Sequence, residues 1–147
     1  MQIGSLLRST DYFRRSLVRA GGPCGHKEWL HFCVQTDDLD LLINFSVNDD
    51  VHAPADRRRE CGHVIMLARS GNRWFGDADR YWAHEMDVAG GEVAACMGTC
   101  RVALDGEAFR VVAGLRDVPL MVELTLIPEV APSFSNNIHL VAGQDRK

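Results

Sequence analysis

The first candidate chemistry lies in residues 28–35, EWLHFCVQ, whose alternation is typical of a β-strand. On an extended strand Trp29 and His31 share one face, while Leu30 and Phe32 occupy the other. An indole N–H donates a hydrogen bond, and an imidazole donates or accepts a proton near pH 7. We therefore expect Trp29 to bind a ligand and His31 to act in catalysis. The structural alternative is an indole that fills the core and an imidazole that ends at a strand edge.

Asn44 is a polar residue inside the apolar run 41–47, LLINFSV. A carboxamide among apolar side chains is costly unless it is hydrogen-bonded. Asn44 is thus a candidate for orienting a substrate carbonyl. It serves equally well to satisfy a bulge or a neighbouring side chain.

Glu123 stands on the mixed face of residues 120–127, LMVELTLI, together with Met121 and Thr125. Inside a dry lumen it would hold a proton and act as a general acid, whereas in water it is only the polar side of a strand. Arg101 and Arg110 lie on preceding strands as ion-pair partners, and Arg110 is also a candidate substrate-binding residue.

The segment 76–87, GDADRYWAHEMD, interleaves aromatic and ionisable side chains where the strand rhythm falters. Irregular segments on a rigid scaffold often carry function. We expect Trp82 to bind a ligand and His84 to move a proton at a barrel mouth. The alternative is an exposed polar loop held in place by its aromatic residues.

Side-chain parity brings these candidates together. The run from Leu39 to Val47 has one wholly apolar face, which we expect outside the barrel against a helix or a second subunit. Asn44 then faces the interior with Trp29 and His31, and Glu123 joins them by the same reasoning. A register error of one residue reverses this assignment.

Metal and cofactor sites are not expected. The spacings Asp77-x-Asp79, Cys61-x-His63 and Cys96-x-x-x-Cys100 match no known metal loop or structural zinc site. The chain has no glycine-rich phosphate loop and no G-x-S-x-G motif, so no nucleotide or flavin site is predicted.

Two kinds of element must position the candidates. Residues 5–19 predict an amphipathic helix with Leu6, Phe13 and Leu17 near one face, in an N-terminal arm of residues 1–22. Residues 23–147 form the second unit, where turn signals recur about every 8–12 residues. That rhythm favours an all-β domain, an antiparallel barrel of about eight strands that holds one small hydrophobic ligand.

Charge and composition exclude several classes of protein. The 147 residues are 46% apolar and 24% charged, as in ordinary globular proteins. Twenty acidic and 16 basic side chains argue against nucleic-acid binding, although residues 1–27 hold five basic residues and one acidic residue. No run reaches the roughly 18 apolar residues of a membrane span. The absence of a signal-peptide pattern and an odd count of five cysteines predict a cytoplasmic protein with reduced thiols.

The strand HKEWLHFCV with the following LLINFSV resembles the opening of lipocalin-like domains in the carotenoid hydratase (hydroxyneurosporene synthase) and AttH-like superfamily. The closing stretch DVPLMVELTLIPEVAP is also similar to theirs. The superfamily includes polyketide cyclases and Diels–Alder catalysts, so the resemblance implies a lipocalin-like barrel and a hydrophobic substrate. Members usually carry two such domains, whereas this chain has room for one. A homodimer or a partner domain is therefore an open alternative.

Together these observations predict a cofactor-independent cyclase, isomerase or hydratase that folds a polyene-like or polyketide-like molecule inside a barrel. The alternative is a non-catalytic module that binds a lipophilic ligand. Polar groups that converge inside a cavity would favour the enzyme, and a wholly apolar lumen would favour the binding module.

Overall fold

The computed structural model describes residues 3–10, 13, 27–49, 60–88 and 92–130. Within these ranges the chain forms one α-helix, one short 3₁₀ helix and nine strands, which confirms the all-β class. In chain order the elements are α1 (Ile3–Thr10), β1 (Lys27–Gln35), β2 (Leu39–Asp49), β3 (Glu60–Ser70), β4 (Arg73–Trp82), η2 (Ala83–Glu85), β5 (Met86–Asp87), β6 (Ala94–Met97), β7 (Cys100–Asp105), β8 (Ala108–Gly114) and β9 (Met121–Leu126).

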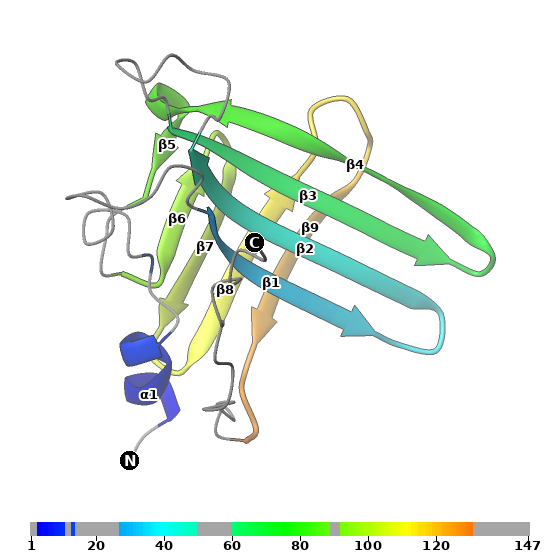
Figure 1. The fold of residues 1–147 in the computed structure, drawn as a ribbon. Helices are drawn as coiled ribbons and strands as arrows, with labels where there is room; N and C mark the ends of the chain where they lie inside the picture. Colours follow the sequence, from blue (N-terminus) through cyan, green and yellow to red (C-terminus); the bar gives the residue numbers. More distant parts are fainter. Residues whose placement is uncertain (1–2, 11–12, 14–26, 50–59, 89–91, 131–147) are drawn as a thin grey trace, which may run out of the picture.

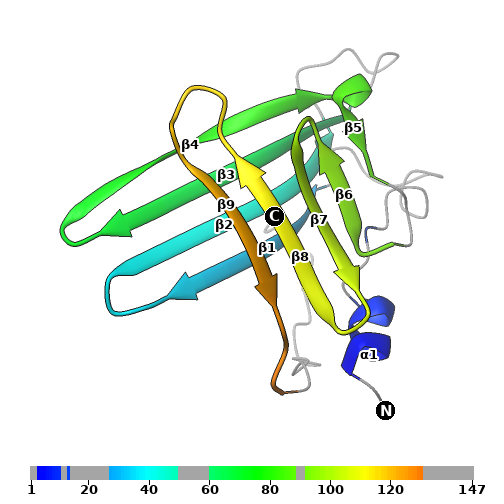
Figure 2. The ribbon, with the colours of Figure 1, turned by 180° about the vertical axis from the view of Figure 1, so that it is seen from behind.

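The strands form two antiparallel sheets that lie across one another (Figures 1 and 2). The first sheet has the order β1-β2-β3-β4, and the second has the order β5-β6-β7-β8-β9. The chain passes from the first sheet to the second through η2, between β4 and β5. In the described part of the chain β1 and β9 are edge strands that pair on one side only, so a closed eight-stranded barrel is not formed there.

The core lies between the two sheets. On β2 the side chains of Leu41, Ile43, Phe45 and Val47 are at most 4% exposed, and the rings of Phe32 and Phe109 join β1 to β8 with centroids 5.3 Å apart. From β3, Val64, Met66 and Ala68 complete the first sheet's inner face, and the second sheet contributes mainly Met97, Val102, Val111 and Ala113.

The apolar face of β2 therefore points inward, and the prediction that it lies outside the barrel is wrong. The error has a physical cause, because burying four large apolar side chains from one strand stabilises the fold by several kcal/mol. Exposing this face to water would lose that free energy. An outward orientation is therefore stable only where another element covers the face.

The N-terminal helix packs on the sheets. Leu7 and Phe13 belong to the hydrophobic core, and the backbone N–H of Phe13 donates to the carbonyl of Glu92 at 3.1 Å. Arg8 Nη2 donates to the carbonyl of Gly106 at 2.7 Å, in the turn between β7 and β8. The predicted helix over 5–19 corresponds to α1 as far as Thr10, while Leu17 and the side chain of Leu6 lie outside what the structure describes. No helix in the described ranges is long and apolar enough to cross a membrane.

Candidate functional site

The predicted trio on the first sheet is brought together, but on the outer face. His31 lies opposite Asn44 in the β1–β2 register, and Asn44 Nδ2 is 3.4 Å from His31 Nδ1. Trp29 is 56% exposed on the same face. The prediction that these side chains face the interior is therefore wrong, because their strand neighbours Leu30 and Phe32 are the ones that pack against the core.

Glu123 and Arg110 lie on the outer face of the second sheet, apart from that trio. Arg110 Nη1 donates to Thr125 Oγ1 at 2.9 Å across β8 and β9. Glu123 is exposed and lies opposite Val112 in the register. The predicted interior position of Glu123 is wrong for the same reason, since Val122 and Leu124 pack against the core instead.

Trp82 and His84 are brought together at a pocket where the first sheet gives way to the second. This corner pocket has a volume of about 440 Å³ and is lined by Glu60, Trp82, Ala83 and His84. The Trp82 indole is 41% exposed, and the guanidinium of Arg80 stacks over it at 4.3 Å. The segment that was expected to form a ligand-binding mouth thus contributes an indole and an imidazole to one concave surface.

Glu60 is the pocket residue that sequence reasoning missed. Glu60 is the first residue of β3 and is only 5% exposed, which is unusual for an acidic residue. The local sequence carries no sign of this burial, because the pocket forms only when the start of β3 meets the end of β4 in the sheet. Cys61 pairs with Trp82 in that register.

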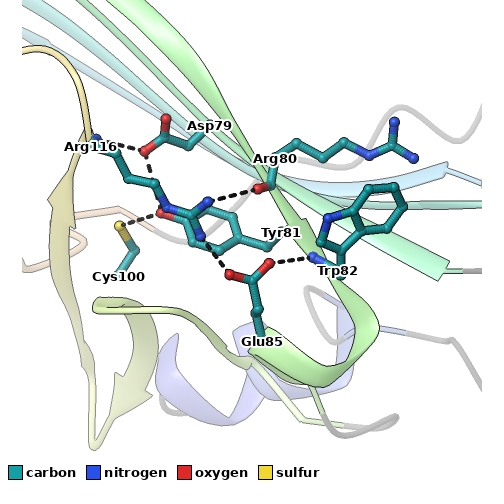
Figure 3. A network of polar contacts seen from close by, with 7 residues as sticks. All are labelled: Asp79, Arg80, Tyr81, Trp82, Glu85, Cys100 and Arg116. Carbon is teal, nitrogen blue, oxygen red and sulfur yellow. Dashed lines mark hydrogen bonds and ion pairs between the residues drawn. The ribbon is translucent and has the colours of Figure 1, made fainter.

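A carboxylate holds the pocket-forming segment in place (Figure 3). Glu85 Oε2 accepts the backbone N–H of Trp82 at 2.9 Å, and Glu85 Oε1 accepts from Arg116 Nη2 at 2.8 Å. The hydrogen bond from Trp82, helped by the charge of Arg116, lowers the pKa of Glu85. Glu85 thus remains ionised at neutral pH and closes the turn that carries Trp82 and His84.

Arg116 ties this turn to the loop between β8 and β9. Its backbone N–H donates to Asp79 Oδ2 at 2.8 Å, and its guanidinium stacks on the Tyr81 ring at 4.4 Å (Figure 3). Arg116 therefore connects both sheets at the side of the corner pocket. The contacts of Arg116 could not be predicted from local sequence, since Asp79 and Glu85 lie more than 30 residues away along the chain.

Tyr81 anchors the network in the core. Its side chain is 2% exposed, and its hydroxyl lies 3.6 Å from Cys100 Sγ and 3.5 Å from Asp79 Oδ2. Burial raises the pKa of Tyr81, and the contact with Cys100 adds to the effect. The hydroxyl is therefore protonated at neutral pH, and it fixes geometry rather than accepting protons.

Comparisons with known proteins assign no family. No family model matches the chain, and no curated protein or solved structure is similar to it. Among the described residues, no group of three or more His, Cys, Asp or Glu side chains is arranged to hold a metal ion.

Proposed function

We propose that this protein binds a lipophilic small molecule in the corner pocket. The observation that carries the proposal is a pocket of about 440 Å³ that is lined, among the described residues, by Glu60, Trp82, Ala83 and His84. Pockets for small ligands are typically about 300–1,000 Å³, with mostly apolar walls and a few polar groups that fix orientation. The corner pocket fits both descriptions.

Each lining residue has a distinct part in this proposal. The Trp82 indole and the Ala83 methyl group supply apolar contact, and His84 offers one hydrogen bond to a polar end of the ligand. Glu60 gives the pocket a carboxyl group that is 5% exposed and therefore held in position. A ligand with a long apolar body and one oxygen-bearing end matches this arrangement.

The two crossed sheets and the resemblance noted above support a finer description of the fold. We infer a lipocalin-like barrel that stays open between β1 and β9 and between β4 and β5, with residues 3–10 and 13 of the N-terminal arm packed against the domain 23–147. The packing of Leu7 and Phe13 into the core supports the inferred position of the N-terminal arm.

A second candidate function is a cofactor-independent isomerase, cyclase or hydratase. The observation in its favour is that His84 and Glu60, two groups able to move a proton, line the same pocket as the Trp82 indole. In this version His84 is the catalytic residue and Trp82 binds the substrate. His31 and Asn44 contribute nothing to it, since they lie on the outer face of β1 and β2.

Binding is tested with cis-parinaric acid, a fluorescent polyene with one carboxylate. We expect saturable binding of one molecule per chain. Ala83→Phe fills the pocket and should weaken binding at least tenfold. Ala78→Phe is the matched control, because Ala78 is an exposed alanine on β4 that does not line the pocket, and its affinity should equal that of the wild type. Binding that never saturates, or that Ala83→Phe leaves unchanged, contradicts the proposal.

Catalysis is tested separately by incubating the protein with polyene alcohols and analysing the products by mass spectrometry. If the protein is an enzyme, His84→Gln should abolish conversion while cis-parinaric acid still binds. Binding without any conversion in the wild type favours the carrier. Conversion that persists in His84→Gln contradicts the catalytic role of His84.

A further inference from the structure

A second cluster of reactive side chains lies on the outer face of the first sheet, away from the corner pocket. Cys33 Sγ is 3.2 Å from His31 Nε2, and both side chains are exposed on β1. On the other side of the imidazole, Asn44 of β2 lies 3.4 Å from Nδ1. The imidazole of His31 thus lies between the thiol of Cys33 and the carboxamide of Asn44, and the three side chains come from two neighbouring strands.

This order is the one that activates a thiol. A neutral imidazole has one nitrogen that donates and one that accepts, and the group bonded to the first decides the role of the second. The oxygen and nitrogen of an Asn side chain exchange places by a simple flip. The structure places Asn44 Nδ2 toward His31 Nδ1. The flipped amide places Oδ1 there instead, so that Nδ1–H donates to Oδ1 and Nε2 is able to take the proton of Cys33.

The sheet register places the three side chains next to one another on one face. His31 and Asn44 are direct cross-strand partners, and Phe32 between His31 and Cys33 is anchored against Phe109 in the core. The backbone therefore holds His31 and Cys33 in a fixed relation.

We propose that Cys33 is a nucleophilic thiol that is oxidised by hydroperoxides, with His31 as its proton carrier and Asn44 as the residue that orients the imidazole. The cluster stands on an exposed strand face, which suits a small electrophile that needs no binding pocket. His31 takes the thiol proton, and the thiolate attacks one peroxide oxygen. The S–O bond forms, the O–O bond breaks, and the leaving oxygen takes the proton from His31. Sulfur is oxidised to the sulfenic acid, and the peroxide is reduced to an alcohol or water.

Two other cysteines, Cys96 and Cys100, serve as internal controls for the reactivity of Cys33. Cys96 is also exposed, on β6 of the second sheet, and lies opposite Arg101 in the register. The described hydrogen bonds include none from an imidazole to Cys96. Cys100 is buried between Gly114 and Tyr81, so its protection reports that the fold is intact.

The experiment treats the full chain with limiting hydrogen peroxide at pH 7, traps sulfenic acid with dimedone and measures each cysteine by peptide mass spectrometry. We expect Cys33 to react at least tenfold faster than Cys96. His31→Gln should bring Cys33 down to the rate of Cys96, and Asn44→Leu should slow Cys33 severalfold. Neither change should alter Cys96.

Equal rates at Cys33 and Cys96 in the wild-type protein overturn the proposal. It is also overturned if both His31→Gln and Asn44→Leu leave the rate at Cys33 unchanged while Cys100 stays protected. If Cys100 becomes reactive in one variant, that variant has lost its fold and the other one decides. Because none of these residues lines the corner pocket, binding of cis-parinaric acid should be the same in every variant.

Discussion

Replacing Trp82 with alanine is the most direct perturbation of the corner pocket. Trp82 lines the pocket, and 41% of its surface is exposed. A bound lipophilic molecule would cover part of that exposed surface. Trp82→Ala removes the contact area without placing a charge or a bulky group in the pocket.

The exposed fraction sets the size of the effect. A tryptophan side chain offers about 250 Å² of surface, so roughly 100 Å² of Trp82 is open to a ligand. At about 25 cal/mol per Å², complete coverage contributes about 2.5 kcal/mol, which is roughly sixtyfold in affinity. A ligand that covers about half of that surface gains about 1.2 kcal/mol from it, so we expect Trp82→Ala to weaken binding about eightfold.

The assay measures the fluorescence of cis-parinaric acid itself, since the variant lacks an indole that transfers energy to it. Trp74→Ala is the matched control, because Trp74 lies on β4 too and is stacked under Arg69 as Trp82 is under Arg80. Trp74 is 63% exposed and does not line the pocket, so its loss should leave affinity unchanged. Equal affinities for the two variants, both with unchanged melting temperatures, would refute the assignment of the pocket.

Two further predictions concern stability. Burial, followed by the charges of Arg80 and Lys27, lowers the pKa of His63, so the unfolded chain binds a proton near pH 6.5 that the folded chain does not. The free energy of unfolding should therefore fall as the pH is lowered below about 6.5, and His63→Gln should flatten this dependence in urea titrations; an unchanged slope contradicts the reasoning. Gly98→Ala should destabilise the fold by more than Gly71→Ala, because both glycines have φ +58° but only a Cβ at position 98 meets the Tyr81 ring. The backbone conformation alone should cost each variant about 1–2 kcal/mol of stability. Equal losses of stability in thermal unfolding would show that the Tyr81 ring moves aside.

The fold class was within reach of the sequence because its signals are local. The Asp105-Gly106 pair is typical of a hairpin turn, and Gly106 has φ +62° in the turn between β7 and β8. Alternation along β1 and β2 also grouped Trp29, His31 and Asn44 correctly on one face. Which face points inward is not a local property, since it depends on how much apolar surface the whole sheet buries.

The expected site failed at that step for a specific reason. A catalytic site needs polar groups, which favours a polar-lined interior, but four residues of β2 that alternate with Asn44 are large, apolar and buried: Leu41, Ile43, Phe45 and Val47. Their burial outweighs any local preference. Interleaved aromatic and ionisable residues marked Trp82 and His84 as candidates, although Trp82 ends the regular strand β4 and only His84 lies in η2. Glu60 and Arg116 reach this segment from distant parts of the chain.

The position of the corner pocket follows from where strand pairing stops. Ile43, Phe45, Val64 and Met66 between the sheets are fully buried, so that part of the core leaves no surface for a ligand. At η2 the chain leaves one sheet and enters the other, and its backbone groups need partners outside the ladders. Glu85 supplies them through its side chain, which accepts from Trp82, and through its carbonyl, which accepts from Gly98 at 2.9 Å. The same hydrogen bonds that allow the chain to change sheets thus fix the backbone that carries the solvent-facing Trp82 and His84, and a binding site benefits from such a fixed backbone.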